Sequence, residues 1–257
     1  PMSLTQNGRP APARETQGPR RRLFDPWLAC ILVAAAFLIF TNLGQRPLWQ
    51  DEAETACLAV NVLETGLPHA YDGVNFVSQE ERREFNADDG YLWRWSPWLQ
   101  IYLSAAGMAV GGKNAFADRL PFAVAGLLCV LLTYLLIRDK FDDPVWARLS
   151  SLLLTLSAPF LLFARQGRYY SVGTLLVLVA LYAFLSDWRK KWTPFVILAL
   201  SMLLLFHANY LLFLSFAPCM LIAAFMVYPD RLPVKRLLLL IAVSLAIIVP
   251  AIPLYRV

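Results

Sequence analysis

Long apolar runs, separated by short polar breaks, constrain the fold of this chain more than any other feature. Hydrophobic residues make up 58% of the 257 residues and charged residues 16%, against about 45–50% and about 25% in soluble domains. A globular core cannot hold this excess, whereas a lipid bilayer is its natural solvent. We therefore predict an all-α polytopic membrane protein with about seven transmembrane helices, at residues 27–43, 120–137, 146–163, 169–185, 194–206, 210–228 and 237–254.

The stretch 194–228 is too long to cross a bilayer once. As one helix it would measure about 50 Å, since each residue adds about 1.5 Å, and the hydrocarbon core is only about 30 Å thick. The polar break His207-Ala208-Asn209 is where we expect it to fold back.

The only long polar stretch follows the first apolar run. Residues 51–64 carry apolar side chains at helical spacing on one face, which predicts an amphipathic helix lying at the membrane interface. Residues 95–110 are apolar but short for a span, which needs about 20 residues. The distribution of positive charge decides between crossing and lying on the surface.

If residues 95–110 lie on the surface, every strongly basic short loop faces the cytoplasm, as the positive-inside rule requires. We therefore expect juxtamembrane helices within an external loop, 44–118, and a disordered cytoplasmic tail, 1–22, before a single membrane module, 23–257. This places residues 165–168 and 207–209 on the same external face. The basic loops carry Arg138, Lys140 and Arg148; Arg189, Lys190 and Lys191; and Arg231, Lys235 and Arg236.

Charge, cysteines and chain ends narrow the class further. The formal charge of +5 comes from scattered short clusters, so no nucleic-acid partner is expected. The four cysteines show no CxxC spacing, and we expect no disulfide or metal role for them. Neither end is typical of a natural terminus, so we expect a fragment that lacks a C-terminal part.

Two carboxylates, Asp51 and Glu52, stand at the start of the predicted interfacial helix, inside the motif Leu-Trp-Gln-Asp-Glu-Ala at 48–53. Acidic residues at a helix N-terminus can act only as caps, gaining about 0.3–1 kcal/mol from the helix dipole. Alternatively, an acid held at the membrane surface can serve as a general base for an acceptor hydroxyl or amine. The motif alone leaves the two readings even.

Two arginines, Arg165 and Arg168, lie three residues apart in the predicted external turn between the third and fourth spans. They could simply snorkel to the interface. Arginine is unexpected on the outer side, however, and its guanidinium fork matches phosphate oxygens. This favours a site for a lipid-linked phosphate, with Tyr170 beside it.

Five further positions are weaker candidates. Arg94 and Trp95 lie in an aromatic cluster that serves as an interfacial belt or as a sugar-stacking wall with a phosphate contact. His207 is a hydrogen-bonded structural residue or a substrate contact. Asp88 and Asp89 form a turn or bind a divalent cation, the one cofactor for which the sequence offers candidates.

The ordered series of these motifs resembles the N-terminal membrane module of the GT-C superfamily. This superfamily comprises glycosyltransferases that use polyprenyl-phosphate sugars, such as protein O-mannosyltransferases and the aminoarabinose transferases of lipid A. The resemblance covers residues 23–257 and rests on the motifs at 48–53, 95–98, 119–122, 165–170 and 206–210.

The resemblance implies roles for individual residues. Asp51 matches the family's essential acidic residue, with Glu52 as its neighbour, and Arg168 matches the arginine after the third span. Arg94 lies near the position where some members have a phosphate-contacting lysine, but this chain has Arg-Trp-Ser-Pro there instead of Lys-Pro.

The sequence therefore leads us to expect a glycosyltransferase of the cell (inner or plasma) membrane. Its donor would be a polyprenyl-phosphate sugar, its acceptor a glycan, lipid or protein, and its site would face the external or periplasmic side. Two alternatives stay open: a transporter or flippase for a lipid-linked or anionic solute, and a catalytically silent scaffold of the same fold.

Overall fold

The computed structural model describes residues 25–77, 87–186, 191–227 and 234–255. Over these residues the chain is helical, with two isolated β-bridges and no strand, which confirms the predicted all-α class. The predicted tail 1–22 lies outside the described residues. The helices are α1 (Pro26–Phe40), α2 (Gln50–Thr65), α3 (Leu99–Gly111), α4 (Ala115–Phe141), α5 (Pro144–Leu156), α6 (Ala158–Ala164), α7 (Tyr170–Phe184), α8 (Trp192–Ala208), α9 (Tyr210–Val227) and α10 (Val234–Tyr255), with a short 3₁₀ turn at Ala87–Asp89.

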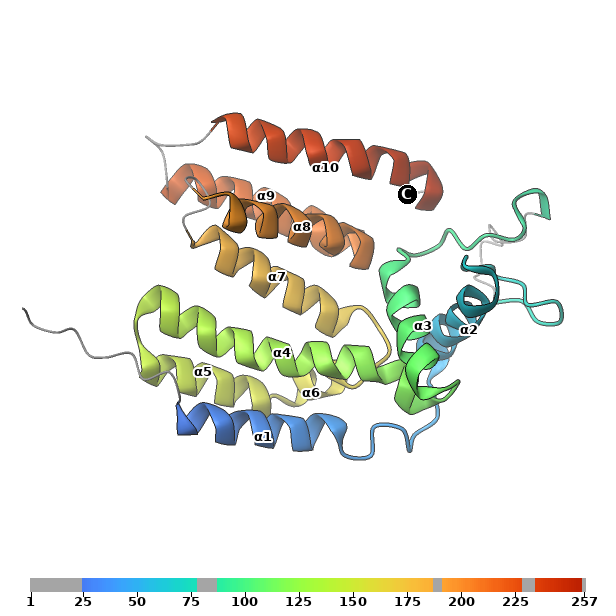
Figure 1. The fold of residues 1–257 in the computed structure, drawn as a ribbon, viewed down its shortest axis with the longest axis horizontal. Helices are drawn as coiled ribbons and strands as arrows, with labels where there is room; N and C mark the ends of the chain where they lie inside the picture. Colours follow the sequence, from blue (N-terminus) through green and yellow to red (C-terminus); the bar gives the residue numbers. More distant parts are fainter. Residues whose placement is uncertain (1–24, 78–86, 187–190, 228–233, 256–257) are drawn as a thin grey trace, which may run out of the picture.

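Most of these helices run side by side, whereas α2 and α3 lie across one end of the bundle (Figure 1). The turns α6–α7 and α8–α9 and the start of α4 reach the same end, which we call the α2/α3 end. The segments that the sequence places on one face, 44–118, 165–168 and 207–209, thus come to one end of the molecule where they are described. The side of the membrane that this end faces stays a prediction.

Two described helices are long and apolar enough to span a bilayer by themselves, at Ala115–Phe141 and Val234–Ala251. A third candidate arises if α5 and α6 form one bent span. The other predicted spans coincide with apolar helices of 10–17 residues, shorter than the about 20 residues that a perpendicular span needs. The number seven therefore stays a prediction.

The predicted span 146–163 is not one straight helix. The axes of α5 and α6 differ by 67° at the break. Ser157 ends α5 and caps α6, accepting the N–H of Phe160 at 3.4 Å. Pro159 has no N–H with which to continue the hydrogen-bond ladder of α5, so the sequence itself contains the bend that a count of apolar residues misses.

The helix at 51–64 and the break at 207–209 are confirmed by α2 and by the α8–α9 junction. The apolar stretch 95–110 forms α3, which begins at Leu99 and packs against α2 and α4 instead of running along the bundle. A core that includes Leu58 and Ala59 of α2 with Ile101 and Ala105 of α3 joins the two helices.

Close contact between α3 and α4 depends on a glycine. A Cβ added to Gly107 would overlap the carbonyl oxygen of Ala117 and lie 2.9 Å from the ring of Pro121. Pro121 lies inside α4, where its missing N–H leaves the carbonyl of Ala117 without its helical partner. The pairing of Gly107 with this turn fixes α3, and with it α2, over the start of α4.

The opposite end of the bundle is held by polar contacts. Asp25 caps α1 and accepts hydrogen bonds from Tyr134 at 2.6 Å and from Arg148 at 2.9 Å. Asp139 accepts from Arg138 at 2.8 Å and from Tyr182 at 3.0 Å. Three of the basic residues that the sequence assigns to the cytoplasm, Arg138, Lys140 and Arg148, lie at this end.

Candidate active site

The two carboxylates at the start of α2 have different surroundings. The side chain of Asp51 is 39% exposed, whereas Glu52 is completely buried. On a helix, consecutive residues are about 100° apart. The two acids therefore face different neighbours.

Glu52 has both carboxylate oxygens occupied. Oε1 accepts hydrogen bonds from Nε of Arg119 at 2.9 Å and from the backbone N–H of Gly167 at 2.8 Å. Oε2 lies 2.5 Å from NH2 of Arg119 and accepts the N–H of Trp49 at 3.3 Å. This last bond is the capping interaction that the sequence suggested, and the other three tie α2 to α4 and to the α6–α7 turn.

Arg119 fixes the connection between α1 and α2. Besides the pair with Glu52, its guanidinium donates to three backbone carbonyls of that connection: Leu43 and Arg46 at 2.9 Å and Pro47 at 3.1 Å. In the sequence Arg119 stands out only as part of the motif at 119–122. The signal available was a charged residue at the start of an apolar helix, which by itself does not show its partner 67 positions away.

The α6–α7 turn approaches α2 and α4 closely at Gly167. A Cβ at this position would overlap Oδ2 of Asp118, which is buried and whose other oxygen accepts a hydrogen bond from Ser104. Glycine at 167 therefore lets the turn come near enough for its N–H to reach Glu52. The buried pair and this contact together position the next residue, Arg168.

Arg168 reaches across to α2. Its NH1 donates to the carbonyl of Asp51 and to the hydroxyl of Thr55, both at 3.1 Å. Its NH2 lies 3.6 Å from Oδ2 of Asp51, and its NH1 lies 3.5 Å from Oε1 of Glu54. The structure thus brings together Asp51 and Arg168, which are 117 positions apart in the sequence.

The guanidinium of Arg168 has a buried donor that makes no hydrogen bond. Its Nε is buried and has no hydrogen-bond partner among the described residues. A buried N–H without a partner costs free energy, and an oxygen of a bound anion would satisfy it.

Arg165 has a different position from Arg168. It donates to the carbonyls of Leu38 and Thr41, both at 2.7 Å, at the C-terminal end of α1. Helix C-termini carry partial negative charge, which arginine stabilises. The two arginines that the sequence assigns to one phosphate therefore contact α1 and α2 respectively.

The loop before α3 holds the remaining candidates. Arg94 pairs with Asp89, with NH2 3.1 Å from Oδ2, and Asp89 also accepts the N–H of Leu92 at 3.3 Å. Trp95 is 42% exposed. Within the described residues no group of three or more His, Cys, Asp or Glu side chains gathers around a possible metal position; Asp88 and Asp89 lie in the 3₁₀ turn.

Tyr170 and His207 lie at the α2/α3 end. The Tyr170 ring centroid is 4.5 Å from those of Phe163 and Tyr169. These aromatic rings line a cavity of about 490 Å³ between α6, α7 and α9. His207 lies in the last turn of α8, with its ring edge-to-face to that of Phe206.

Comparison with known proteins identifies the family of this chain. Residues 96–254, more than half of the chain, match the family described as dolichyl-phosphate-mannose-protein mannosyltransferase. The chain belongs to this family. It is thereby a member of the GT-C superfamily, as the resemblance implied.

The fold of this GT-C chain is similar to that of ArnT from Cupriavidus metallidurans. The structure of ArnT bound to undecaprenyl phosphate superimposes with a TM-score of 0.68 at 18% identity, covering 90% of this chain and 41% of ArnT. The apo structure gives 0.67 at 19% identity, covering 90% and 42%. At these identities the likeness concerns the fold.

A protein of Aquifex aeolicus (strain VF5), named only as uncharacterized, is 26% identical over 164 residues. The match covers 63% of this chain and 30% of the Aquifex protein. The GT-C chain thus spans about two-fifths of ArnT or less than a third of the Aquifex protein.

Proposed function

We propose that this chain carries the catalytic base and a donor-phosphate contact of a membrane glycosyltransferase. The enzyme transfers a sugar from a polyprenyl-phosphate carrier to an acceptor on the non-cytoplasmic side. The observation that carries the proposal is the contact between a half-exposed carboxylate, Asp51, and a largely buried arginine, Arg168, with 3.6 Å between their charged atoms. Family membership and the undecaprenyl phosphate bound to ArnT support a lipid-linked donor.

In the proposed reaction the acceptor oxygen or nitrogen attacks the anomeric carbon of the sugar. Asp51 takes the proton of the attacking group as general base. The bond between the anomeric carbon and the phosphate oxygen breaks, and the electron pair leaves with the lipid phosphate. Arg168 stabilises the negative charge that grows on this phosphate, and it does so most strongly in the transition state.

Arg168 needs only a small adjustment for this task. Its Nε donor has no partner among the described residues, and its ion pairs with Asp51 and Glu54 are long, at 3.6 and 3.5 Å. A phosphate beside Asp51 can therefore bind to Arg168 while the hydrogen bonds to the α2 backbone and to Thr55 hold the guanidinium in place.

Glu52 acts in this proposal as a positioning residue and not as a base. Its oxygens accept four hydrogen bonds and the side chain is completely buried. The cavity beside Tyr170 has apolar and aromatic walls next to the turn that carries Arg168, and it suits the first prenyl units of the donor. Arg94 is a further candidate for a phosphate contact, and Trp95 and His207 are candidates for substrate contacts.

A radiolabelled polyprenyl-phosphate sugar, supplied to the full-length protein in liposomes, tests the proposal. Label found on an acceptor shows transfer, whereas label that crosses the bilayer still attached to its lipid shows a flippase. Label that does neither would leave a scaffold, and either of the last two results would refute the proposal.

A further inference from the structure

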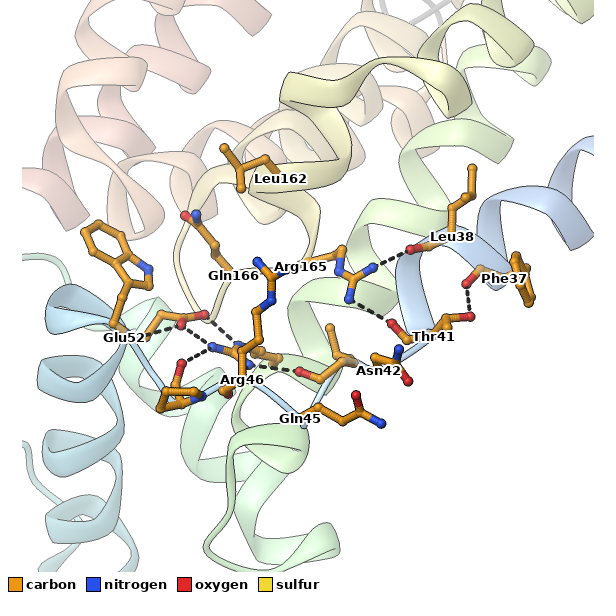
Figure 2. A pocket seen from close by; sticks show the side chains of 14 residues that line it. Phe37, Leu38, Thr41, Asn42, Gln45, Arg46, Glu52, Leu162, Arg165 and Gln166 are labelled. Atoms are coloured by element: carbon orange, nitrogen blue, oxygen red, sulfur yellow. Dashed lines mark hydrogen bonds and ion pairs between the residues drawn. The ribbon is translucent and has the colours of Figure 1, made fainter.

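A second hollow lies at the α2/α3 end, bordered by the end of α1, the α1–α2 connection and the α6–α7 turn (Figure 2). Its volume is about 690 Å³. Trp49 and Glu52 line it, but Asp51 and Arg168 do not. It therefore borders the proposed catalytic helix without being part of the proposed catalytic contact.

The hollow carries an excess of positive charge. Three arginines line it, Arg46, Arg119 and Arg165, together with one carboxylate, Glu52. Arg119 occupies that carboxylate. The pKa of Arg165 is lowered, mainly by burial and to a smaller extent by repulsion from Arg46 and Arg119. The three arginines are therefore close enough to repel one another, and an anion between them would relieve this repulsion.

Many hydrogen-bond donors of this cluster are unused. Arg165 uses two N–H groups on the carbonyls of α1 and so retains three of its five donors. The side chain of Arg46 extends toward Arg165 and Gln166 (Figure 2), and no described residue pairs with its guanidinium. A phosphate accepts several such bonds, and pairs with arginine are among the strongest hydrogen bonds in proteins.

Gln166 indicates that the ligand also carries a hydrogen-bond donor. Its Oε1 is buried and has no hydrogen-bond partner among the described residues, and Gln166 lines the hollow. This oxygen can only accept, so it does not bind the phosphate itself. A hydroxyl attached beside the phosphate would satisfy it.

The rim of the hollow is apolar. Phe37 of α1 and Leu162 of α6 line it and are 67% and 58% exposed, on helices whose outer faces suit lipid. A ligand whose charged head meets the arginines would therefore place an apolar tail along these side chains. The arginines inside the hollow and the apolar side chains at its rim together suit an amphiphile better than a soluble anion.

The hollow is distinct from the place proposed for the donor. Arg168 contacts Asp51, Glu54 and Thr55, whereas the α2 residue that faces the hollow is Glu52, about 100° around the helix from Asp51. Arg165 contacts α1 on the other side of the turn.

We propose that this hollow, hereafter the arginine pocket, binds the anionic, hydroxyl-bearing headgroup of a bilayer phospholipid that is not the sugar donor. Such a lipid joins the end of α1 and the α1–α2 connection to the turn that carries Arg168. Binding depends on the pocket alone. The accompanying expectation, that anionic lipid raises transfer by steadying this turn, rests on the proposed function.

The test is a lipid titration of the delipidated full-length protein, followed by native mass spectrometry. The probes are phosphatidylglycerol, phosphatidylcholine and glycerol phosphate. The variant is Arg46→Gln, because the Arg46 side chain is exposed and pairs with no described residue, so that the fold does not depend on it. The matched control is Lys113→Gln, which removes one positive charge elsewhere at the same end, from an exposed ion pair with Glu64.

We expect phosphatidylglycerol to bind the wild type more tightly than phosphatidylcholine does. Arg46→Gln should weaken the binding of phosphatidylglycerol about tenfold, which corresponds to the loss of one charge-assisted hydrogen bond. Arg46→Lys should recover part of this loss. Lys113→Gln should bind like the wild type. Equal binding by Arg46→Gln would overturn the proposal, and so would glycerol phosphate binding as tightly as the lipid.

Polyprenyl phosphate supplies the last arm. If Arg46→Gln weakens the binding of polyprenyl phosphate as much as that of phosphatidylglycerol, the pocket belongs to the donor and the proposal fails. Lipid binding and sugar transfer are measured separately. A protein that binds phosphatidylglycerol as expected but transfers no sugar would refute the proposed function and not the arginine pocket.

Discussion

The buried ion pair between Glu52 and Arg119 offers a sharp test of how the site is assembled. Replacing Glu52 by Gln keeps the shape of the side chain but leaves Arg119, 8% exposed, without its carboxylate. Removing one partner of a buried pair costs about 3–5 kcal/mol, because the remaining charge is buried without compensation. The NH2 group of Gln also meets the donors of Arg119 and Gly167, where the carboxylate oxygens accepted hydrogen bonds.

A loss of this size lowers the Tm by about 10–15 °C in a domain of this length. The assay is thermal unfolding of the purified protein in one detergent, followed by the loss of helical circular dichroism. Glu64→Gln is the matched control, because it breaks an exposed ion pair with Lys113, and pairs of this kind contribute little. If Glu52→Gln unfolds at the temperature of the wild type while Glu64→Gln does the same, Glu52 does not hold the site together.

Three further changes test other parts of the structure. Arg168→Gln should lower kcat by about 10²–10³-fold, as the loss of one donor to a developing charge does elsewhere, with the helix content unchanged; transfer at the wild-type rate would exclude Arg168 from the phosphate site. Gly107→Val should destabilise the protein, because the contact between α3 and α4 has no room for a Cβ. The control Gly66→Ala should cost only about 1 kcal/mol, since this glycine has φ +84° and open space around it. Equal Tm values for the two variants would refute the close packing of α3 on α4. In a variant without the four native cysteines, a membrane-impermeant maleimide added to intact cells should label cysteine at Gln45 and not at Asp142, since these exposed positions lie at opposite ends of the bundle; the reverse pattern would invert the predicted topology.

Local sequence patterns predicted the parts of the fold that local interactions determine. The amphipathic helix α2 and the break between α8 and α9 followed from apolar periodicity and from helix length against bilayer thickness. The distribution of lysine and arginine separated residues 95–110 from the spans, and α3 does lie across one end of the bundle, while its place at the membrane surface stays a prediction. The approach of Asp51 to Arg168 also followed, because the alternating direction of the runs brings both to one end.

Other features depend on contacts between distant residues and could not be read locally. The pattern that placed Arg165 and Arg168 in one turn gave no information on the directions of their side chains, and these directions separate them. Glu52 and Asp51 are equivalent in sequence, and only the approach of Arg119 and Gly167 shows which of them is buried. Pro159 indicates the bend at Ser157, but a count of apolar residues cannot detect a change in the direction of the helix axis.

Asp51→Asn tests the central claim most directly. Donor binding and single-turnover transfer are measured with the same radiolabelled polyprenyl-phosphate sugar, and Glu54→Gln, which removes another carboxylate near Arg168, is the control. We predict that Asp51→Asn binds the donor and transfers its sugar about 10²–10⁴-fold more slowly, while Glu54→Gln keeps most of its activity. Transfer by Asp51→Asn at the wild-type rate would contradict this prediction.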